Sequence, residues 1–178
     1  GILAIVKYPN PPTIDHQFSD LPSPLMVFDR IQDPSNVGSL MRVAEATGCR
    51  DVVYIKGTSD PYSPKSIRAS AGSVLRLRLY PIVSVEELSF LLTKNNISLL
   101  TMSPRTGVNL YKAEISGKIA LVLGNETHGV DPLLAHEAMF QIKIPMDGKG
   151  ESLNVTSAAS VILYRLHNHI HTHKNTHT

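Results

Sequence analysis

The sequence holds 178 residues, of which 42% are hydrophobic and 18% charged, and its formal net charge is +2. This composition is ordinary for a globular protein and excludes a disordered or fibrous chain, while the length suits one domain with a substantial core. Apolar runs such as Ile119–Leu123 are far shorter than the ~20 residues of a membrane helix, so no transmembrane span is predicted. A net charge this small does not by itself indicate a nucleic-acid partner.

The chain has a single cysteine, Cys49, so no intrachain disulfide can form. This fits a reducing compartment, and we expect a cytoplasmic protein. A lone cysteine is more often structural than a catalytic thiol, and we interpret Cys49 in that way. Because the chain begins at Gly1 without a methionine, we interpret it as a shortened or processed piece that lacks an N-terminal segment.

The N-terminal 24 residues are predicted to form a short strand and then an extended arm. Ile2–Val6 is rich in β-branched residues, which favours a strand. Several prolines follow it, and proline lacks the amide donor that a helix or a central strand needs. The prolines are Pro9, Pro11, Pro12, Pro22 and Pro24.

From residue 25 onward, strands and helices are predicted to alternate. The predicted strands are Leu25–Phe28, Asp51–Ile55, Leu75–Leu79, Ile97–Met102, Ile119–Leu123 and Phe140–Ile144. The predicted helices are Val37–Ala44, Ser84–Asn95, Pro132–Ala138 and Val155–Leu166. The first helix follows the capping residues Asp33 to Asn36 and ends before Gly48, a typical residue after a helix C-terminus.

The strand segments are mostly continuous apolar runs, which is typical of strands buried on both faces. We therefore predict an α/β domain with a parallel sheet covered by helices on both faces. In such sheets ligands bind beyond the carboxyl ends of the strands. Three polar loops of this chain are predicted to lie there.

One stretch is basic. Between Asp60 and Glu86 there are four cations and no anion, and the cations are Lys65, Arg68, Arg76 and Arg78. Arginines alternate with leucines over Leu75–Leu79, so the polar face of that predicted strand is basic. An RNA-binding face is one interpretation, and a merely solvated face is the other, which charge alone favours.

The last residues place a histidine at every second position from His167 to His173. An extended tract of this kind can bind a metal, but it has no acidic or cysteine partner, and we predict no metal site. We expect residues 167–178 to be a solvated, flexible tail.

The first polar loop leads into the helix at Val37. Asn36 stands at the helix start, Gly38 allows another backbone to approach, and Arg42 projects from the polar side. An arginine there is commonly just solvated, although its fork of donors also suits a phosphate.

The second loop, Gly124–Gly129, reads GNETHG and directly follows a predicted strand. It lacks the Lys-Ser/Thr ending of a phosphate loop and the G-x-G spacing of a dinucleotide fingerprint. Glu126 in this loop is a hydrogen-bond acceptor, a general base or only a turn residue.

The third loop begins the stretch Ile144–Arg165, IPMDGKGESLNVTSAASVILYR. It gathers many hydrogen-bonding groups between an apolar strand and an apolar helix, which is more than a connector needs. The loop is therefore predicted to bind a ligand.

Together the three loops resemble the three motifs of the SpoU, or TrmH-like, family of RNA 2′-O-ribose methyltransferases in the SPOUT superfamily. Their order and spacing agree over roughly Leu25 to Leu166, and the intervening segment SIRASAGSV also resembles the family. Thr127 and His128 differ from the small or acidic residues that are commoner there. The resemblance implies that residues 25–166 are the methyltransferase domain and that residues 1–24 are the junction to a missing RNA-binding domain.

The resemblance also implies a cofactor, a fold and a set of site residues. Members bind S-adenosylmethionine in a deep C-terminal trefoil knot and act as homodimers whose active site takes residues across the interface. The cofactor residues implied here are Met102, Gly124, Ile144, Met146 and Leu153. The residues implied at the ribose end are Asn36, Arg42, Glu126, Ser152 and Asn154, and the implied partner is tRNA or rRNA.

Methyl transfer to a ribose hydroxyl is an in-line displacement, so the site must align the reacting atoms and assist removal of the hydroxyl proton. An arginine has a pKa above ~12, and deprotonating it at neutral pH costs at least ~7 kcal/mol. We therefore interpret Arg42 as a cation that holds phosphate and stabilises the developing alkoxide, oriented by Glu126 and Asn154. A base role requires a site that strongly lowers that pKa.

Two other functions remain open from the sequence. One is a catalytically inactive RNA-binding or ribosome-assembly module, although such a protein would be expected to have lost Arg42, Glu126 or Asn154, and all three are present. The other is an unrelated nucleotide-binding α/β protein, against which the absence of a phosphate loop argues.

Overall fold

The computed structural model describes residues 7–8, 10–11, 24–103, 106–148 and 152–174. The strand predicted at Ile2–Val6 and most of the proline-rich arm lie outside these residues. Among the helices within the described ranges, none has both the length and the hydropathy that a membrane crossing requires.

In the described part of the chain, seven parallel strands form one sheet in the order β3-β2-β1-β6-β4-β7-β5. The strands are β1 (Leu25–Asp29), β2 (Asp51–Ile55), β3 (Arg78–Ile82), β4 (Ile97–Met102), β5 (Val108–Asn109), β6 (Lys118–Gly124) and β7 (Phe140–Lys143). The central pair is β1 and β6, in which Leu25 lies opposite Ala120 and Asp29 opposite Gly124. Both strands consist almost entirely of buried apolar residues, as expected for a parallel sheet that is covered on both faces.

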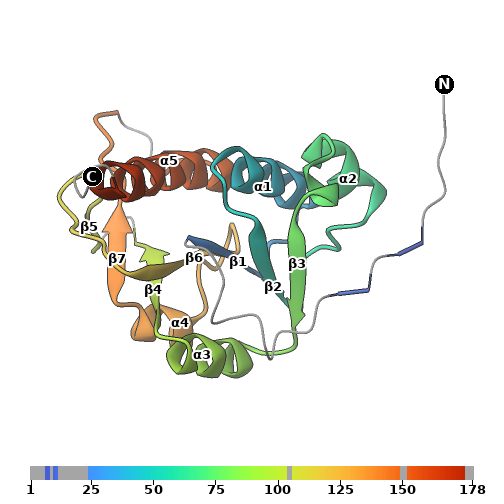
Figure 1. Cartoon of the computed structure of the whole chain (residues 1–178), viewed down its shortest axis with the longest axis horizontal. Coiled ribbons are helices and arrows are strands. Elements are labelled where there is room, and N and C mark those ends of the chain that lie inside the picture. Colours follow the sequence, from blue (N-terminus) through green and yellow to red (C-terminus); the bar gives the residue numbers. More distant parts are fainter. Residues whose placement is uncertain (1–6, 9, 12–23, 104–105, 149–151, 175–178) are drawn as a thin grey trace.

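Helices cover both faces of the sheet (Figure 1). On one face lie α1 (Pro34–Ala46), α2 (Pro64–Ser70) and α5 (Val155–Lys174), and on the other α3 (Val85–Lys94) and α4 (Pro132–Glu137). Alternate residues of β1 enter two separate apolar cores, with Phe28 on the α1 and α5 side and Val27 on the α3 and α4 side. The predicted α/β architecture is confirmed.

Helix α1 begins and ends as its sequence predicts. The Asp33 side chain caps it by accepting a hydrogen bond from the Ser35 amide at 2.9 Å, and Pro34 occupies the first turn. Gly48 follows its end with a φ of 78°, which favours glycine. The helix therefore holds Asn36 at a defined place beyond the end of β1.

Gly38 brings α2 against α1. A Cβ atom at Gly38 would lie 2.4 Å from the Ser66 carbonyl oxygen and 2.5 Å from the Ala69 Cβ, closer than atoms can approach. The sequence predicted this close approach but did not identify α2 as a helix. The small residues of α2 allow the contact, because Ser66 and Ser70 are buried there.

The strand predicted at Leu75–Leu79 is wrong in its first half. Residues Ser73–Leu75 form a 3₁₀ turn (η2), Leu75 is 79% exposed, and β3 begins only at Arg78. Polar contacts hold the turn, since the Glu45 carboxylate of α1 accepts hydrogen bonds from Ser73 Oγ at 2.6 Å and from the Arg76 guanidinium. Residues 75–77 therefore have the alternation of leucine and arginine that is typical of a strand, but they do not form one.

The C-terminal helix is longer than predicted. Helix α5 continues to Lys174, past the predicted end at Leu166, so the backbone is helical over 167–174 where a loose tail was expected. The 3.6-residue apolar periodicity of the segment ends near Leu166, and for this reason the sequence signal stopped there.

Replacing Gly38 by alanine is expected to destabilise the fold by about 1–3 kcal/mol, because the new methyl group forces α2 away from α1. The free energy of unfolding in urea measures the effect. Gly148→Ala is the matched control, since a Cβ there meets nothing within 4 Å, and it should change stability by less than about 0.5 kcal/mol. Equal stabilities for the two variants would contradict the tight helix contact.

The Glu45 cluster is expected to make stability depend on pH. Hydrogen bonds from Arg76 and Ser73 lower the pKa of Glu45 from 4.5 to about 2. A lowered pKa means that this carboxylate stabilises the fold above pH 4.5 and that its contribution is lost as the pH falls toward 2. The melting temperature of Glu45→Gln should therefore fall less than that of the wild type on acidification, whereas Glu114→Gln, at an exposed glutamate, should follow the wild type.

Candidate functional site

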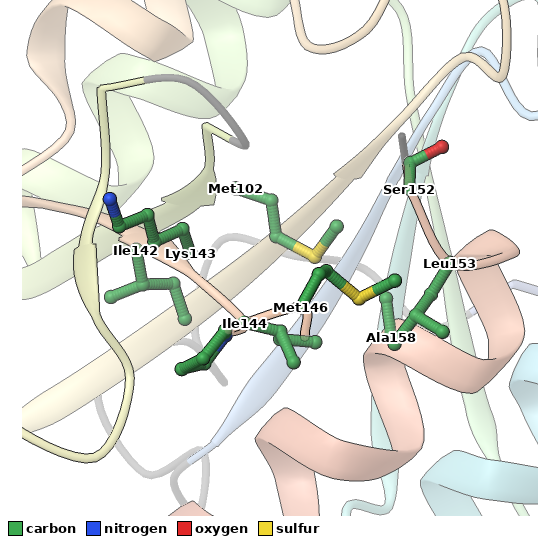
Figure 2. A pocket seen from close by; sticks show the side chains of 9 residues that line it. Met102, Ile142, Lys143, Ile144, Met146, Ser152, Leu153 and Ala158 are labelled. Carbon is green, nitrogen blue, oxygen red and sulfur yellow. The ribbon is translucent and has the colours of Figure 1, made fainter. Parts of the chain in front are cut away.

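A pocket of about 390 Å³ lies at the carboxyl ends of β4 and β7, next to the start of α5. Figure 2 shows the side chains of Met102 and Met146 converging in it, with Leu153 and Ala158 beside them. The full lining is Met102, Ile142, Lys143, Ile144, Pro145, Met146, Ser152, Leu153 and Ala158. The pocket thus presents an apolar interior with two thioethers and a main-chain rim.

A second pocket of about 370 Å³ adjoins the first and shares Met102, Ser152 and Leu153 with it. It is lined by Met102, Val122, Leu123, Gly124, Asn125, Glu126, Gly129, Val130, Ser152, Leu153, Asn154 and Val155. All five predicted cofactor residues, Met102, Gly124, Ile144, Met146 and Leu153, line one or both pockets. Both pockets expose apolar and polar atoms; because the second also carries the polar side chains of Asn125, Glu126 and Asn154, we call the first the apolar pocket and the second the polar pocket.

The loop after β6 is a closed turn that presents Glu126. The Gly129 amide donates to the Asn125 carbonyl at 2.8 Å, and the backbone folds so tightly that a Cβ at Gly124 would lie 2.3 Å from the Gly129 carbonyl carbon. Inside the turn, the Asn125 side-chain oxygen accepts from the Thr127 amide at 2.9 Å and the His128 amide at 3.0 Å. Glu126, Thr127 and His128 are exposed at its tip.

A buried carboxylate ties this loop to β1. Asp29 is fully buried and accepts hydrogen bonds from the Arg30 guanidinium at 2.7 Å and from the Asp131 amide at 2.6 Å. Arg30 also pairs with the Asp131 carboxylate at 3.1 Å, and its carbonyl accepts from the Asn125 side chain at 3.0 Å. These contacts raise the pKa of Arg30, chiefly through the hydrogen bond with Asp29. The sequence analysis missed this network, although an aspartate ending an apolar strand was a signal for it.

Helix α1 and the loop after β6 meet at Glu126. The Asn36 side-chain nitrogen donates to Glu126 Oε1 at 2.7 Å, which joins two of the predicted site residues across the sheet edge. Asn154 stands at the start of α5, where its Oδ1 accepts from the Thr156 amide at 2.8 Å. Asn154 also lines the second pocket.

Arg42 is the predicted site residue that lies apart. Its side chain is exposed on α1 and lines neither of the two pockets. Glu126, Ser152 and Asn154 all line the second pocket, and Asn36 contacts it through Glu126. Within the described residues of one chain, the other predicted site residues thus lie together, and Arg42, the predicted cation, lies outside the site.

Three of the four predicted RNA-binding cations are engaged within the protein. Lys65 pairs with Asp33 at 3.1 Å, Arg76 with Glu45, and Arg78 with the buried Asp51 at 2.6 Å. Arg68 is exposed on α2. The basic stretch therefore contributes to folding as well as to surface charge. Cys49 is buried, and burial raises the pKa of its thiol to about 12, which agrees with a structural role.

The arrangement suits a ligand with an apolar portion next to a reacting polar group. The apolar pocket offers thioether and main-chain contacts, and the adjoining pocket offers a carboxylate, a hydroxyl and two amides from Glu126, Ser152, Asn154 and Asn125. A group bound across both pockets would pass the residues that they share, Met102, Ser152 and Leu153.

Comparison with known proteins finds the SpoU rRNA Methylase family over residues 23–164. The chain is 31% identical over 144 residues to the 23S rRNA (guanosine(2553)-2′-O)-methyltransferase RlmP of Bacillus subtilis, covering 80% of this chain and 57% of that protein. It is 34% identical over 140 residues to the 23S rRNA (guanosine-2′-O-)-methyltransferase RlmB of Xylella fastidiosa, covering 79% and 56%. The chain thus spans a little over half the length of these curated relatives.

Solved structures show the same likeness. The SpoU methyltransferase AviRb from Streptomyces viridochromogenes, in complex with the cofactor AdoMet, matches with a TM-score of 0.80 and 27% identity, over 89% of this chain and 62% of that one. An AdoMet-bound rRNA methyltransferase from Sinorhizobium meliloti matches with a TM-score of 0.79 and 26% identity, over 85% and 60%. With its motifs, fold and family match in agreement, this chain belongs to the SpoU methylase family.

Proposed function

We propose that this chain is the catalytic domain of an S-adenosylmethionine-dependent methyltransferase that methylates the ribose 2′-hydroxyl of a nucleotide in tRNA or rRNA. The observation that carries the proposal is the pair of adjoining pockets that share Met102, Ser152 and Leu153, the first lined mainly by apolar side chains and the second also by Asn125, Glu126 and Asn154. The relatives named as rRNA 2′-O-methyltransferases and the AdoMet-bound structures support it.

The residues present fit the cofactor. The apolar pocket suits the adenine ring, with the Met102 and Met146 thioethers as polarisable contacts and the main chain at Ile144 and Leu153 as hydrogen-bonding edges. Gly124 lines the second pocket, and its lack of a side chain lets the loop backbone pack against it at Gly129. When bound, S-adenosylmethionine would supply the methyl group of its sulfonium; the carbon–sulfur bond would break as the oxygen–carbon bond forms, leaving a neutral thioether, and the hydroxyl proton would pass to solvent.

The chain's own polar residues orient the ribose. Glu126 accepts a hydrogen bond from Asn36 through Oε1, and in this proposal its second carboxylate oxygen accepts a hydrogen bond from the ribose. Asn154, held by the helix start, donates to the ribose or its phosphate. Such preorganised groups align the attacking oxygen with the methyl carbon, which is the main requirement of an in-line displacement.

Arg42 completes the site from a second copy of the chain in this proposal. Within one chain the exposed Arg42 lies outside both pockets, and a homodimer that crosses at α1 and α5 supplies it in trans. There it remains cationic, binds the neighbouring phosphate and stabilises the developing alkoxide. The deep trefoil knot and a cytoplasmic location, in which Cys49 stays reduced, belong to the same proposal.

An inactive RNA-binding module is the second candidate. Arg42, Glu126 and Asn154 are all retained, and the contact between Asn36 and Glu126 keeps the polar pocket ordered. A module without catalysis does not need that order. The methyltransferase is therefore the better supported function.

Purified protein incubated with labelled S-adenosylmethionine and total RNA is expected to yield alkali-resistant dinucleotides, because a 2′-O-methyl group blocks cleavage of the adjacent bond. Isothermal titration is expected to show binding of S-adenosylmethionine and none of ATP. Binding without any methylated RNA would favour the inactive module, and binding of ATP alone would favour an unrelated nucleotide-binding protein.

Arg42→Ala is expected to lower the rate of methyl transfer by at least about 100-fold while S-adenosylmethionine affinity changes less than about threefold, since the residue acts on ribose and phosphate. Single-turnover assays and titration measure the two quantities. Arg50→Ala, at another exposed arginine, should leave both unchanged. Loss of cofactor binding in Arg42→Ala would assign the residue a different role.

A further inference from the structure

A tyrosine-lined hollow of about 420 Å³ lies at the carboxyl ends of β2 and β3, apart from the two pockets described above. Its volume falls within the ~300–1,000 Å³ typical of small-ligand sites. The lining residues are Tyr8, Tyr54, Ile55, Lys56, Gly57, Thr58, Asp60, Pro81, Ile82 and Val83. Two aromatic rings, one exposed cation, Lys56, and one exposed carboxylate, Asp60, are thus combined in one concavity.

The rings of the hollow are held in place. Tyr8, from the N-terminal arm, packs edge-on against Tyr62 with ring centroids 4.8 Å apart and planes at 63°. Its hydroxyl donates to Asp60 Oδ1 at 3.2 Å, and the same oxygen accepts from the Tyr62 amide at 2.8 Å. Tyr8 is nevertheless 58% exposed, so one side of its ring remains open to a ligand.

The phenol groups are donors at neutral pH. Burial, followed by the neighbouring Asp60 carboxylate, raises the pKa of Tyr8 to about 12. Burial also raises the pKa of Tyr54 and of Tyr62, with Asp60 adding to both. The hollow therefore offers the neutral aromatic faces of Tyr8 and Tyr54 rather than phenolate charge.

The hollow adjoins the methyltransferase site through Arg30. A Cβ at Gly57 would lie 3.1 Å from Arg30 Cγ, and Arg30 in turn pairs with Asp29 and Asp131 beside the loop that carries Glu126. Thr58 Oγ1 donates to the Phe28 carbonyl at 3.1 Å, which fixes the same connection to β1. Because all strands are parallel, the hollow and the polar pocket open at one edge of the sheet.

Resting on the proposed action on RNA, we propose that this hollow binds an unpaired base of the RNA substrate, next to the nucleotide that is methylated. Aromatic faces stack on bases of any sequence, and protein recognition of RNA relies on such splayed, single-stranded bases. Lys56, exposed at the rim, suits the phosphate that connects this base to its neighbour.

The test is fluorescence anisotropy with a labelled 12-nucleotide single-stranded RNA of mixed sequence and with the same strand in a duplex. Tyr8→Leu is expected to weaken single-strand binding about 5- to 150-fold, the effect of one lost base stack, and to leave duplex binding unchanged. Tyr8→Phe, which keeps the ring, should retain most of the affinity. Lys56→Gln should reduce the slope of log K against log salt by about 0.7.

Tyr111→Leu is the matched control, because Tyr111 is 59% exposed and does not line the hollow. Unchanged single-strand affinity in Tyr8→Leu, an equal loss in Tyr111→Leu, or no single-strand binding by the wild type would each overturn the proposal. If the Tyr8→Leu variant methylates RNA normally and its RNA affinity is unchanged, the proposed base site is wrong while the proposed activity stands. If Tyr8 controls RNA affinity but no methylated RNA forms, the base site stands and the proposed activity fails.

Discussion

The carboxylate of Asp29 is the interaction on which the polar edge of the sheet depends. A fully buried charge is tolerated only when partners satisfy it, and here Arg30 and the Asp131 amide do so from two directions. Arg30 adopts a left-handed φ of 56°, which its side chain and carbonyl contacts hold in place. The loops after β1, β2 and β6 all meet at Asp29 and Arg30. The same two residues therefore help to position both Glu126 and the tyrosine-lined hollow.

Because the strands are parallel and in register, the loops that follow them lie next to one another on one edge of the sheet. Asp29 lies opposite Gly124 in the central strand pair, so the segments that follow these residues leave the sheet at the same level. Asn36 then needs only the first turn of α1 to reach Glu126. Arg42 follows almost two turns later on an exposed side of that helix, and this separation is the reason for the proposal that a second chain supplies it.

Local signals in the sequence predicted much of the fold. Caps and apolar periodicity located α1 and α3, and buried runs located β1, β2, β4 and β6, because these features act within a few residues. Interactions between distant residues could not be predicted in that way. The pairing of Arg76 with Glu45 stabilises a turn where alternation indicated a strand, and the two-residue β5 carries no periodicity at all.

In the candidate site, too, some features could be predicted from the sequence and others could not. The predicted cofactor residues were named from motif resemblance, and the structure gathers them in two pockets. The Asp29 network and the tyrosine hollow depend on side chains that come together only in three dimensions, such as Tyr8 with Asp60. The order of the strands also affects how the chain folds while the ribosome synthesises it. Because β1 pairs with β6, the central strand cannot complete its hydrogen bonds until Gly124 has emerged, so a nascent chain that ends before β6 exposes one edge of an apolar strand.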